Sequence, residues 1–328
     1  MRKMLKSTKI LVSFLVAASM LISLSAVALA GDGETATIAA IVSNQNSDGG
    51  WKKTYSETSG DWAKSTIDNK ATYTEIRRLA KEFKSTNNTT YKNAAVKGIN
   101  FLLNMQYANG GFPQIYNSTG YHMHITYNDN AMTNVVILLD DISKKSGDFS
   151  WVDSTLASKC AAAVTKAINC IINTQIVSNG ERQLWCQQHD YSTLKPTSAR
   201  AYELPGNVSS ESVSILRFLM NVDNPSAALK TTIKAGVAYL NKVQIKGIRV
   251  EKSSTDAWIV QDPAAKPIWA RYYEIGTNKP FFAGRDGVKK YSLAEIEQER
   301  RIGYSWYGYW PESLINTDYP AWLAKYPN

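Results

Sequence analysis

The sequence predicts a mainly α-helical protein, an α/α toroid or (α/α)3-type barrel of repeated helix pairs, with small irregular β elements and long loops over a central cleft. Three observations predict this fold class. A glutamine-containing segment recurs four times at similar spacing. The segments between the repeats carry apolar residues at the period of an α-helix, and the alternating patterns of β-strands are scarce. A pair of helices for each repeat would account for the spacing.

Each repeated segment is an apolar helical run that ends in an Asn/Gln pair, followed by a glycine-containing turn and often an aromatic residue. The segments are IVSNQNSDGGW (41–51), LLNMQYANGGF (102–112), IINTQIVSNGERQLW (171–185) and LNKVQIKGIRVE (240–251). The steps are 61, 69 and 69 residues between the glutamines Gln45, Gln106, Gln175 and Gln244. This spacing suits two helices with their connections. The alternative is four unrelated helix ends of similar composition.

Apolar periodicity indicates which segments are helical. The apolar positions that share one face are Val96, Ile99, Leu102 and Leu103 in residues 95–106, and Val164, Ile168, Ile171 and Ile172 in residues 161–175. The runs Asp48-Gly49-Gly50 and Asn109-Gly110-Gly111 offer the left-handed residues that end a helix. Residues 69–83, 128–142 and 209–220 are also helical in pattern. In a toroid, the N-terminal ends of the inner helices would converge on one mouth.

The first thirty residues resemble a secretion signal peptide. Their basic residues are Arg2, Lys3, Lys6 and Lys9. An apolar run over residues 10–24 follows, and Ala28-Leu29-Ala30 fits the cleavage pattern. We therefore expect a secreted, extracellular protein whose single domain spans residues 31–328. The alternative is an uncleaved anchor, and no later segment is expected to be long and apolar enough to cross a membrane.

The charge of the chain favours an anionic partner. The net charge is +9, from 37 basic and 28 acidic residues. The signal segment holds four basic residues and no acidic one, so residues 31–328 keep a net charge of +5. A positive excess concentrates polyanions near a protein. For a secreted protein, we expect an acidic polysaccharide rather than nucleic acid as partner, no membrane association after signal cleavage, and a monomer.

The three cysteines, Cys160, Cys170 and Cys186, leave the disulfide pattern open. On one helix, Cys160 and Cys170 would lie about 15 Å apart, too far for a bridge. Cys186 could pair with either one, or all three could be buried thiols. The sequence has no C-x-x-C motif and no Cys/His cluster, which argues against a zinc site.

Asp and Asn residues gather where two of the helices should begin. Asp68 and Asn69 precede one helical run, and Asn128, Asp129 and Asn130 precede another. Such residues are good N-caps, which would explain them by structure alone. Two clusters at equivalent places in successive repeats would also offer several oxygen ligands to one cation, and calcium prefers such ligands.

Residues 184–212 form a polar, irregular stretch that mixes aromatic and cationic side chains. Lys195, Arg200 and Tyr202 lie there, and aromatic rings beside cations suit sugars that carry carboxylates. The alternative is a solvated basic loop. Arg271 and Arg285 come later in the chain, and an aromatic-rich stretch follows over residues 304–310.

Six segments together resemble the catalytic module of pectate lyases of polysaccharide lyase family ten. They are TIDNKATYTEIRRLA, MQYANGGFPQIY, ITYNDNAMTNVV, LWCQQHDYSTLKPTSARAYELP, WARYYEIGTNKPFFAGRDG and GYSWYGYWP. They occur in order across nearly all of residues 31–328. The resemblance implies cleavage of polygalacturonate (pectate) by calcium-assisted β-elimination, which gives 4,5-unsaturated oligogalacturonides.

The resemblance also implies roles for individual residues. The family's catalytic arginine falls on Arg200. Its calcium ligands fall on Asp68, Asn69 and Asp129. Arg271 and Arg285 look like the family's cationic substrate contacts, and we add Lys195 and Tyr202 as substrate-binding candidates.

A guanidinium normally stays protonated in proteins, so Arg200 as a base must first lose a proton. The alternative role for Arg200 is a carboxylate clamp, with hydroxide or another group as the base.

Two other functions compete with a lyase. An inverting glycoside hydrolase on an α/α toroid would need two facing carboxylates, which Asp68, Asp129, Asp190 and Glu203 could supply. A non-catalytic module that binds acidic polysaccharides would use the aromatic residues between Trp306 and Trp310. Only a lyase creates an unsaturated, ultraviolet-absorbing product.

Overall fold

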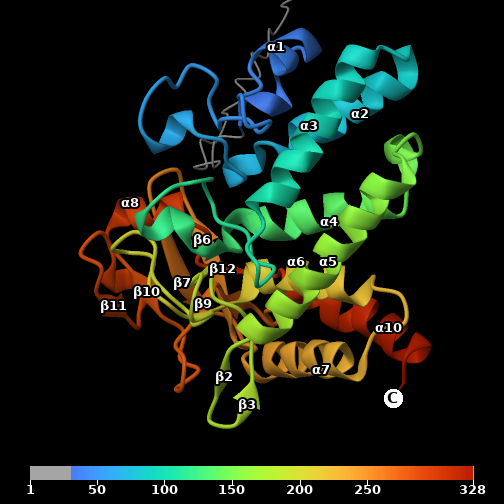
Figure 1. Cartoon of the computed structure of the whole chain (residues 1–328). Coiled ribbons are helices and arrows are strands. Elements are labelled where there is room, and N and C mark those ends of the chain that lie inside the picture. The colour runs from blue at the N-terminus through green and yellow to red at the C-terminus, as the bar shows by residue number, and fades with distance from the viewer. Residues whose placement is uncertain (1–30, 328) are drawn as a thin grey trace, which may run out of the picture.

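The structure is a computed structural model that describes residues 31–327 (Figure 1). The predicted signal peptide lies outside the described residues and stays a prediction. The helices are α1 Ile38–Ser43, α2 Tyr73–Thr86, α3 Thr89–Met105, α4 Ala131–Ser143, α5 Ser154–Thr174, α6 Ser209–Met220, α7 Ala227–Lys242, α8 Gln298–Gly303, α9 Pro311–Ser313 and α10 Tyr319–Lys325.

The strands are short and pair in antiparallel twos, as β1 with β4, β2 with β3, β5 with β9, β6 with β7, β8 with β12 and β10 with β11. Their bounds are β1 Ile125–Thr126, β2 Val177–Ser178, β3 Glu181–Arg182, β4 Gln188–His189, β5 Asn207–Val208, β6 Ile248–Lys252, β7 Ala257–Gln261, β8 Trp269–Ala270, β9 Tyr272–Tyr273, β10 Phe282–Ala283, β11 Lys289–Lys290 and β12 Tyr307–Gly308.

The helices pack as three pairs, α2 with α3, α4 with α5, and α6 with α7. Among the first members, α4 contacts both α2 and α6, and among the second members, α5 contacts both α3 and α7. Figure 1 shows these pairs stacked on one side of the molecule and most of the small strands gathered on the other. The predicted α/α toroid-like class is confirmed, although the described helices do not close into a barrel.

The repeated glutamines stack the second helices of the pairs. The side-chain amides of Gln45, Gln106 and Gln175, which follow α1, α3 and α5, each donate two hydrogen bonds. One goes to a carbonyl shortly after the glutamine's own helix, and the other goes to a carbonyl of the adjacent helix, which is α3, α5 or α7 respectively. The acceptors on that next helix are the carbonyls of Ala94, Ala163 and Thr232, at 2.9, 2.9 and 3.0 Å. Gln244 ends the series and donates to Asn241 instead. The first three glutamines therefore have the same structural role, so the alternative of four unrelated helix ends is wrong.

Three buried tryptophans each donate a hydrogen bond to a carbonyl in the last turns of a helix, two of them at the ends of the first and third repeated segments. The indole N–H of Trp51, Trp185 and Trp269 donates to the carbonyls of Ile41, Ile171 and Leu240, at 2.7, 2.7 and 2.8 Å. All three rings are buried, so these bonds satisfy helix-end carbonyls that water does not reach. Gly49 and Gly110 take positive φ values of 104° and 91°, but α1 and α3 end earlier, at Ser43 and Met105. The prediction that these glycines end the helices is therefore wrong, and they form the turns that follow.

The three cysteines are free and buried. The structure therefore agrees with three buried thiols and not with a disulfide between Cys186 and one of the other two cysteines. Burial raises the pKa of Cys160 and of Cys170 to about 12, so both stay protonated at neutral pH.

One expectation about membranes is wrong. Helix α5 is long and apolar enough to cross a membrane by length and composition, the single such helix within residues 31–327. In the structure α5 packs against α3, α4 and α7, and core helices of helical proteins pass the same test.

Candidate active site

A cleft of about 630 Å³ opens where the N-terminal ends of α2 and α4 meet the loops of the chain's second half. It collects nearly all predicted site residues, which are Asp68, Asn69, Asp129, Arg200, Tyr202, Arg271 and Arg285. Lys195 is exposed on the loop before Arg200 and does not line the cleft, so its binding role stays a prediction. The expectation that the inner helices would converge on one mouth is confirmed for α2 and α4.

Two short 3-10 turns bring the acidic residues to the cleft. Asp68–Lys70 precedes α2 and Asn128–Asn130 precedes α4. Asn69 and Asp129 occupy equivalent left-handed positions, with φ values of 45° and 51°. Asn and Asp tolerate this conformation better than most residues. The same backbone turn therefore points two polar side chains at one space.

These residues make no side-chain hydrogen bond that caps α2 or α4. The N-cap of α2 is Thr72 and that of α4 is Asn130, and neither makes a side-chain capping hydrogen bond. Asp68 instead accepts hydrogen bonds from the side chains of Gln114, at 3.0 Å, and Asn69, at 2.6 Å. The interpretation of these clusters as simple helix caps is therefore wrong.

The acidic side of the cleft carries more negative than positive charge. Asp68 lies 3.5 Å from the ammonium of Lys53. Asp129 accepts a hydrogen bond of 2.9 Å from the amide of Asn128 and has no ion pair among the described residues. Burial, followed by the charge of Glu211, raises the pKa of Asp129. Such a carboxylate gains from a bound cation.

The oxygen-rich donor set of this side fits a hard cation such as calcium. It consists of the carboxylates of Asp68 and Asp129 and the amide oxygen of Asn69. No group of three or more His, Cys, Asp or Glu side chains that could hold a metal occurs in residues 31–327. A cation here would therefore rely on amide oxygens, water or substrate for its remaining ligands.

The opposite side of the cleft contains a buried ion pair between Arg271 and Glu211. The guanidinium of Arg271 donates to Glu211 Oε1 at 2.6 Å, and the two side chains are only 13% and 3% exposed. Glu211 lies in the first turn of α6 and also accepts from Gln187 at 2.9 Å. Burial alone would raise the pKa of Glu211, but Arg271 and these hydrogen bonds lower it overall. Arg271 is thus a fixed cation at the cleft.

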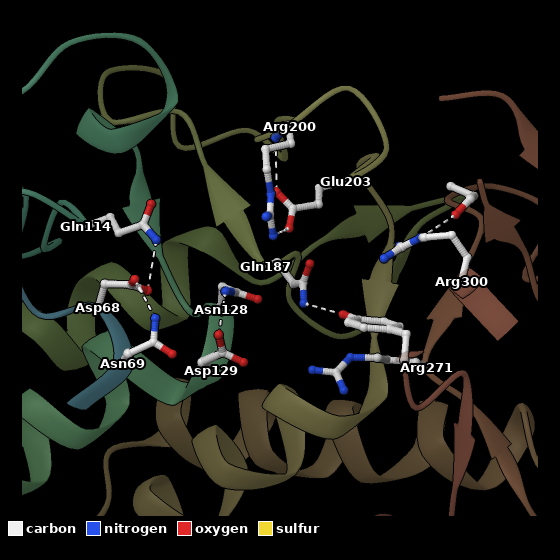
Figure 2. Close-up of polar contacts among 12 residues, drawn as sticks. Asp68, Asn69, Gln114, Asn128, Asp129, Gln187, Arg200, Glu203, Arg271 and Arg300 are labelled. Carbon is white, nitrogen blue, oxygen red and sulfur yellow. Dashed lines mark hydrogen bonds and ion pairs between the residues drawn. The ribbon is translucent and has the colours of Figure 1, made fainter. Parts of the chain in front are cut away.

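Arg200 projects from the loop between β4 and β5 and pairs with Glu203. Its guanidinium forms an ion pair with Glu203 Oε1, and its backbone N–H donates to Glu203 Oε2 at 3.0 Å. Arg200 is 54% exposed, whereas Glu203 is 16% exposed. The hydrogen bond to Glu203 raises the pKa of Arg200 further above its usual value. In this arrangement Arg200 is a cation, poised above the acidic residues (Figure 2).

The structure adds site residues that sequence reasoning missed. Glu211 begins the third inner helix, so extending the Asp/Asn comparison to the third repeat would have found it. Gln114 follows the second glutamine repeat and holds Asp68. Arg300, on α8, also lines the cleft, and no spacing rule in the sequence distinguishes it from its neighbours.

Comparisons with known proteins agree with this site. Residues 39–315 match the family described as pectic acid lyase. A solved family 10 polysaccharide lyase from Cellvibrio cellulosa is 35% identical over 89% of this chain and 95% of its own, with a TM-score of 0.79.

A mutant of a family 10 polysaccharide lyase from the same organism, solved with trigalacturonic acid, is 34% identical over 88% of this chain and 94% of its own, with a TM-score of 0.78. No curated protein matches the chain. These likenesses argue against the hydrolase and the non-catalytic alternatives. The chain belongs to the pectic acid lyase family and is a polysaccharide lyase.

Proposed function

We propose that this protein is a secreted pectate lyase that cleaves polygalacturonate by calcium-assisted β-elimination and releases 4,5-unsaturated oligogalacturonides. One observation carries the proposal. Arg200 and the fixed cation Arg271 share a single cleft with the oxygen donors of Asp68, Asn69 and Asp129. The trigalacturonic acid bound to a similar enzyme supports the choice of substrate class.

The reaction sets two demands on the site. A base must remove the weakly acidic C5 proton next to the uronate carboxylate, and the electron pair of that C–H bond forms the new C4–C5 double bond. The C4–O bond breaks, and the leaving oxygen keeps its electron pair and takes up a proton from water. Positive charge must stabilise the carboxylate as negative charge develops on it. Arg271 meets the second demand without reorganising, because Glu211 holds it in place.

Asp68, Asn69 and Asp129 would hold a calcium ion. When bound, that ion would supply a further positive charge to the uronate carboxylate and so help to acidify C5. The chain's own part is to present these oxygens on two equivalent left-handed turns.

Arg200 is our candidate for the group that receives the C5 proton. It must first leave Glu203, since that ion pair keeps the guanidinium protonated. Alkaline pH and a nearby dication would both favour the neutral form. If Arg200 is instead a carboxylate clamp, hydroxide takes the proton and Arg200 stays charged throughout.

The test is incubation of residues 31–328 with polygalacturonate at alkaline pH, with calcium and then with a chelator. We expect a calcium-dependent rise in the ultraviolet absorbance of unsaturated product. New reducing ends without that absorbance would indicate hydrolysis. The absence of both would contradict the proposal.

A further inference from the structure

The turn before α2 has a backbone that its own residues disfavour. Positive φ values occur at Asn69, Lys70 and Thr72, at 45°, 70° and 68°. A lysine and, above all, a β-branched threonine adopt such values rarely, so surrounding contacts must hold the turn in place. In the equivalent turn before α4, the positive values fall on Asp129 and Asn130, residue types that tolerate them. The turn before α2 therefore depends more on contacts from elsewhere in the chain.

Residues 31–34, which we call the N-terminal strap, contact this turn directly. The backbone N–H of Gly31 donates to the carbonyl of Asn69 at 2.8 Å. The carboxylate of Glu34 pairs with the ammonium of Lys70 at 2.6 Å. The strap thus holds the turn at two of its positive-φ residues.

The strap also packs closely against its neighbours. A Cβ on Gly31 would lie 3.0 Å from the carbonyl oxygen of Asn69, and one on Gly33 would lie 2.0 Å from Oε1 of Glu75 on α2. The carbonyl of Gly33 accepts a hydrogen bond from the guanidinium of Arg78, also on α2, at 2.6 Å. The strap therefore lies directly on the first turns of the helix that the turn precedes.

Asp32 connects the strap to a second segment of the cleft wall. Its backbone N–H donates to the carbonyl of Lys53 at 2.9 Å, and its Oδ2 accepts from the backbone N–H of Tyr55 at 2.7 Å. Lys53 is the residue whose ammonium lies 3.5 Å from Asp68. Asp32 therefore fixes the strap between the segment that faces Asp68 and the turn that carries it.

We propose that the N-terminal strap is a positioning element for the calcium site and that Asp32 is its central residue. The strap holds the turn before α2 so that Asp68 and Asn69 offer their oxygens in a fixed geometry. No residue of the strap lines the cleft, so the strap acts only through this turn. The inference rests on the proposed function, because it assumes a calcium site.

The first measurement needs no calcium. Hydrogen exchange reports the local opening of a turn. The backbone N–H groups of Ala71 and Ala131 make equivalent bonds, to the carbonyls of Asp68 and Asn128. We expect Asp32→Ala to speed exchange at Ala71 by about threefold to tenfold, as the loss of one hydrogen bond predicts, and to leave Ala131 unchanged.

The second measurement is the calcium Kd, by calorimetry in an Arg200→Ala background with trigalacturonate present, so that substrate ligands are available without turnover. Asp32→Ala should weaken calcium binding by about threefold to tenfold. Asp32→Asn removes the same charge but keeps an oxygen that can accept from the N–H of Tyr55, so it should bind calcium nearly as well as the parent. Equal weakening by the two variants would mean that the charge of Asp32 matters and its positioning role is wrong.

Asp153→Ala is the matched control. Asp153 also accepts a hydrogen bond from a backbone N–H, that of Leu156 at 2.9 Å, and it does not line the cleft. Its loss removes one carboxylate and one such bond but should leave exchange at Ala71 and the calcium Kd unchanged. Circular dichroism checks folding. If Asp32→Ala does not fold, Glu34→Gln, which removes the exposed ion pair between strap and turn, should still speed exchange at Ala71.

Two failures are distinguishable. If the strap variants leave exchange at Ala71 unchanged, or raise it equally at Ala131, the strap does not position this turn and the inference is wrong. If the folded Arg200→Ala parent binds no calcium, the calcium-assisted function fails, and the role of the strap at a calcium site fails with it.

Discussion

The first two helix pairs and the third pair use their helix starts in opposite ways. Asp129, at the start of α4, faces the cleft with only an amide as hydrogen-bond donor. Glu211, at the start of α6, is joined to the guanidinium of Arg271. A repeated architecture thus supplies one carboxylate that is open to a cation and another that fixes a cation of the protein itself.

Arg200 tests whether the two sides act together. Arg200→Ala should lower turnover of polygalacturonate by about 10²- to 10⁴-fold, the usual contribution of a positioned proton-transfer group. Its exposed position predicts an unchanged fold, which circular dichroism checks. Steady-state rates measured across alkaline pH would also separate the two roles of Arg200. A variant that kept wild-type turnover would remove Arg200 from the chemistry.

The same carboxylate-to-amide change on each side would test the comparison directly. Glu211→Gln leaves a buried guanidinium without its counter-charge, so it should lower the free energy of unfolding by about 3 to 5 kcal/mol. Asp129→Asn removes a charge that burial and the charge of Glu211 disfavour, so it should leave stability unchanged or raise it slightly.

Urea unfolding of both variants at neutral pH measures the difference. Equal losses of stability would contradict the division of the cleft into an open and an anchored carboxylate.

Glu75 on α2 provides a buried carboxylate outside the cleft. It is fully buried, Oε2 has no hydrogen-bond partner, and burial raises its pKa to about 7. A raised pKa means that the folded state favours the protonated form, so its stabilising contribution is present below about pH 4.5 and is lost as pH rises through 7.

Glu75→Gln should therefore stabilise the protein by up to about 3 kcal/mol above pH 8 and by much less near pH 4. Unfolding curves at both pH values check this. Equal effects at the two pH values would mean that Glu75 does not titrate as its burial predicts.

Calcium binding gives a further stability test of the open side of the cleft. At a concentration one hundred times its Kd, calcium should stabilise the folded protein by about 2.7 kcal/mol. Asp129→Asn should abolish most of this gain, whereas Lys195→Met, on the exposed loop, should preserve it. Thermal unfolding with and without a chelator measures the change. An unaltered melting temperature in the wild-type protein would count against a calcium site in the substrate-free enzyme.

The sequence by itself determined the helical repeat and most of the cleft. Gln45, Gln106 and Gln175 make the same helix-to-helix contact once in each repeat. Because the contact recurs with the repeat, the glutamines recur at similar spacing and can be recognised from the sequence. The Asp/Asn clusters mark helix starts, which an inner layer of helices brings to one mouth.

Only the tertiary structure decided how the charges of the cleft are paired. Glu211 and Arg271 are sixty residues apart in the chain, yet they form one buried ion pair. Arg300 and Arg301 are adjacent, yet only Arg301 meets an acid, Asp256. Ion pairing depends on which loops lie next to each other in the folded chain. Burial then decides how much each ion pair contributes to stability. Neither property follows from spacing along the chain.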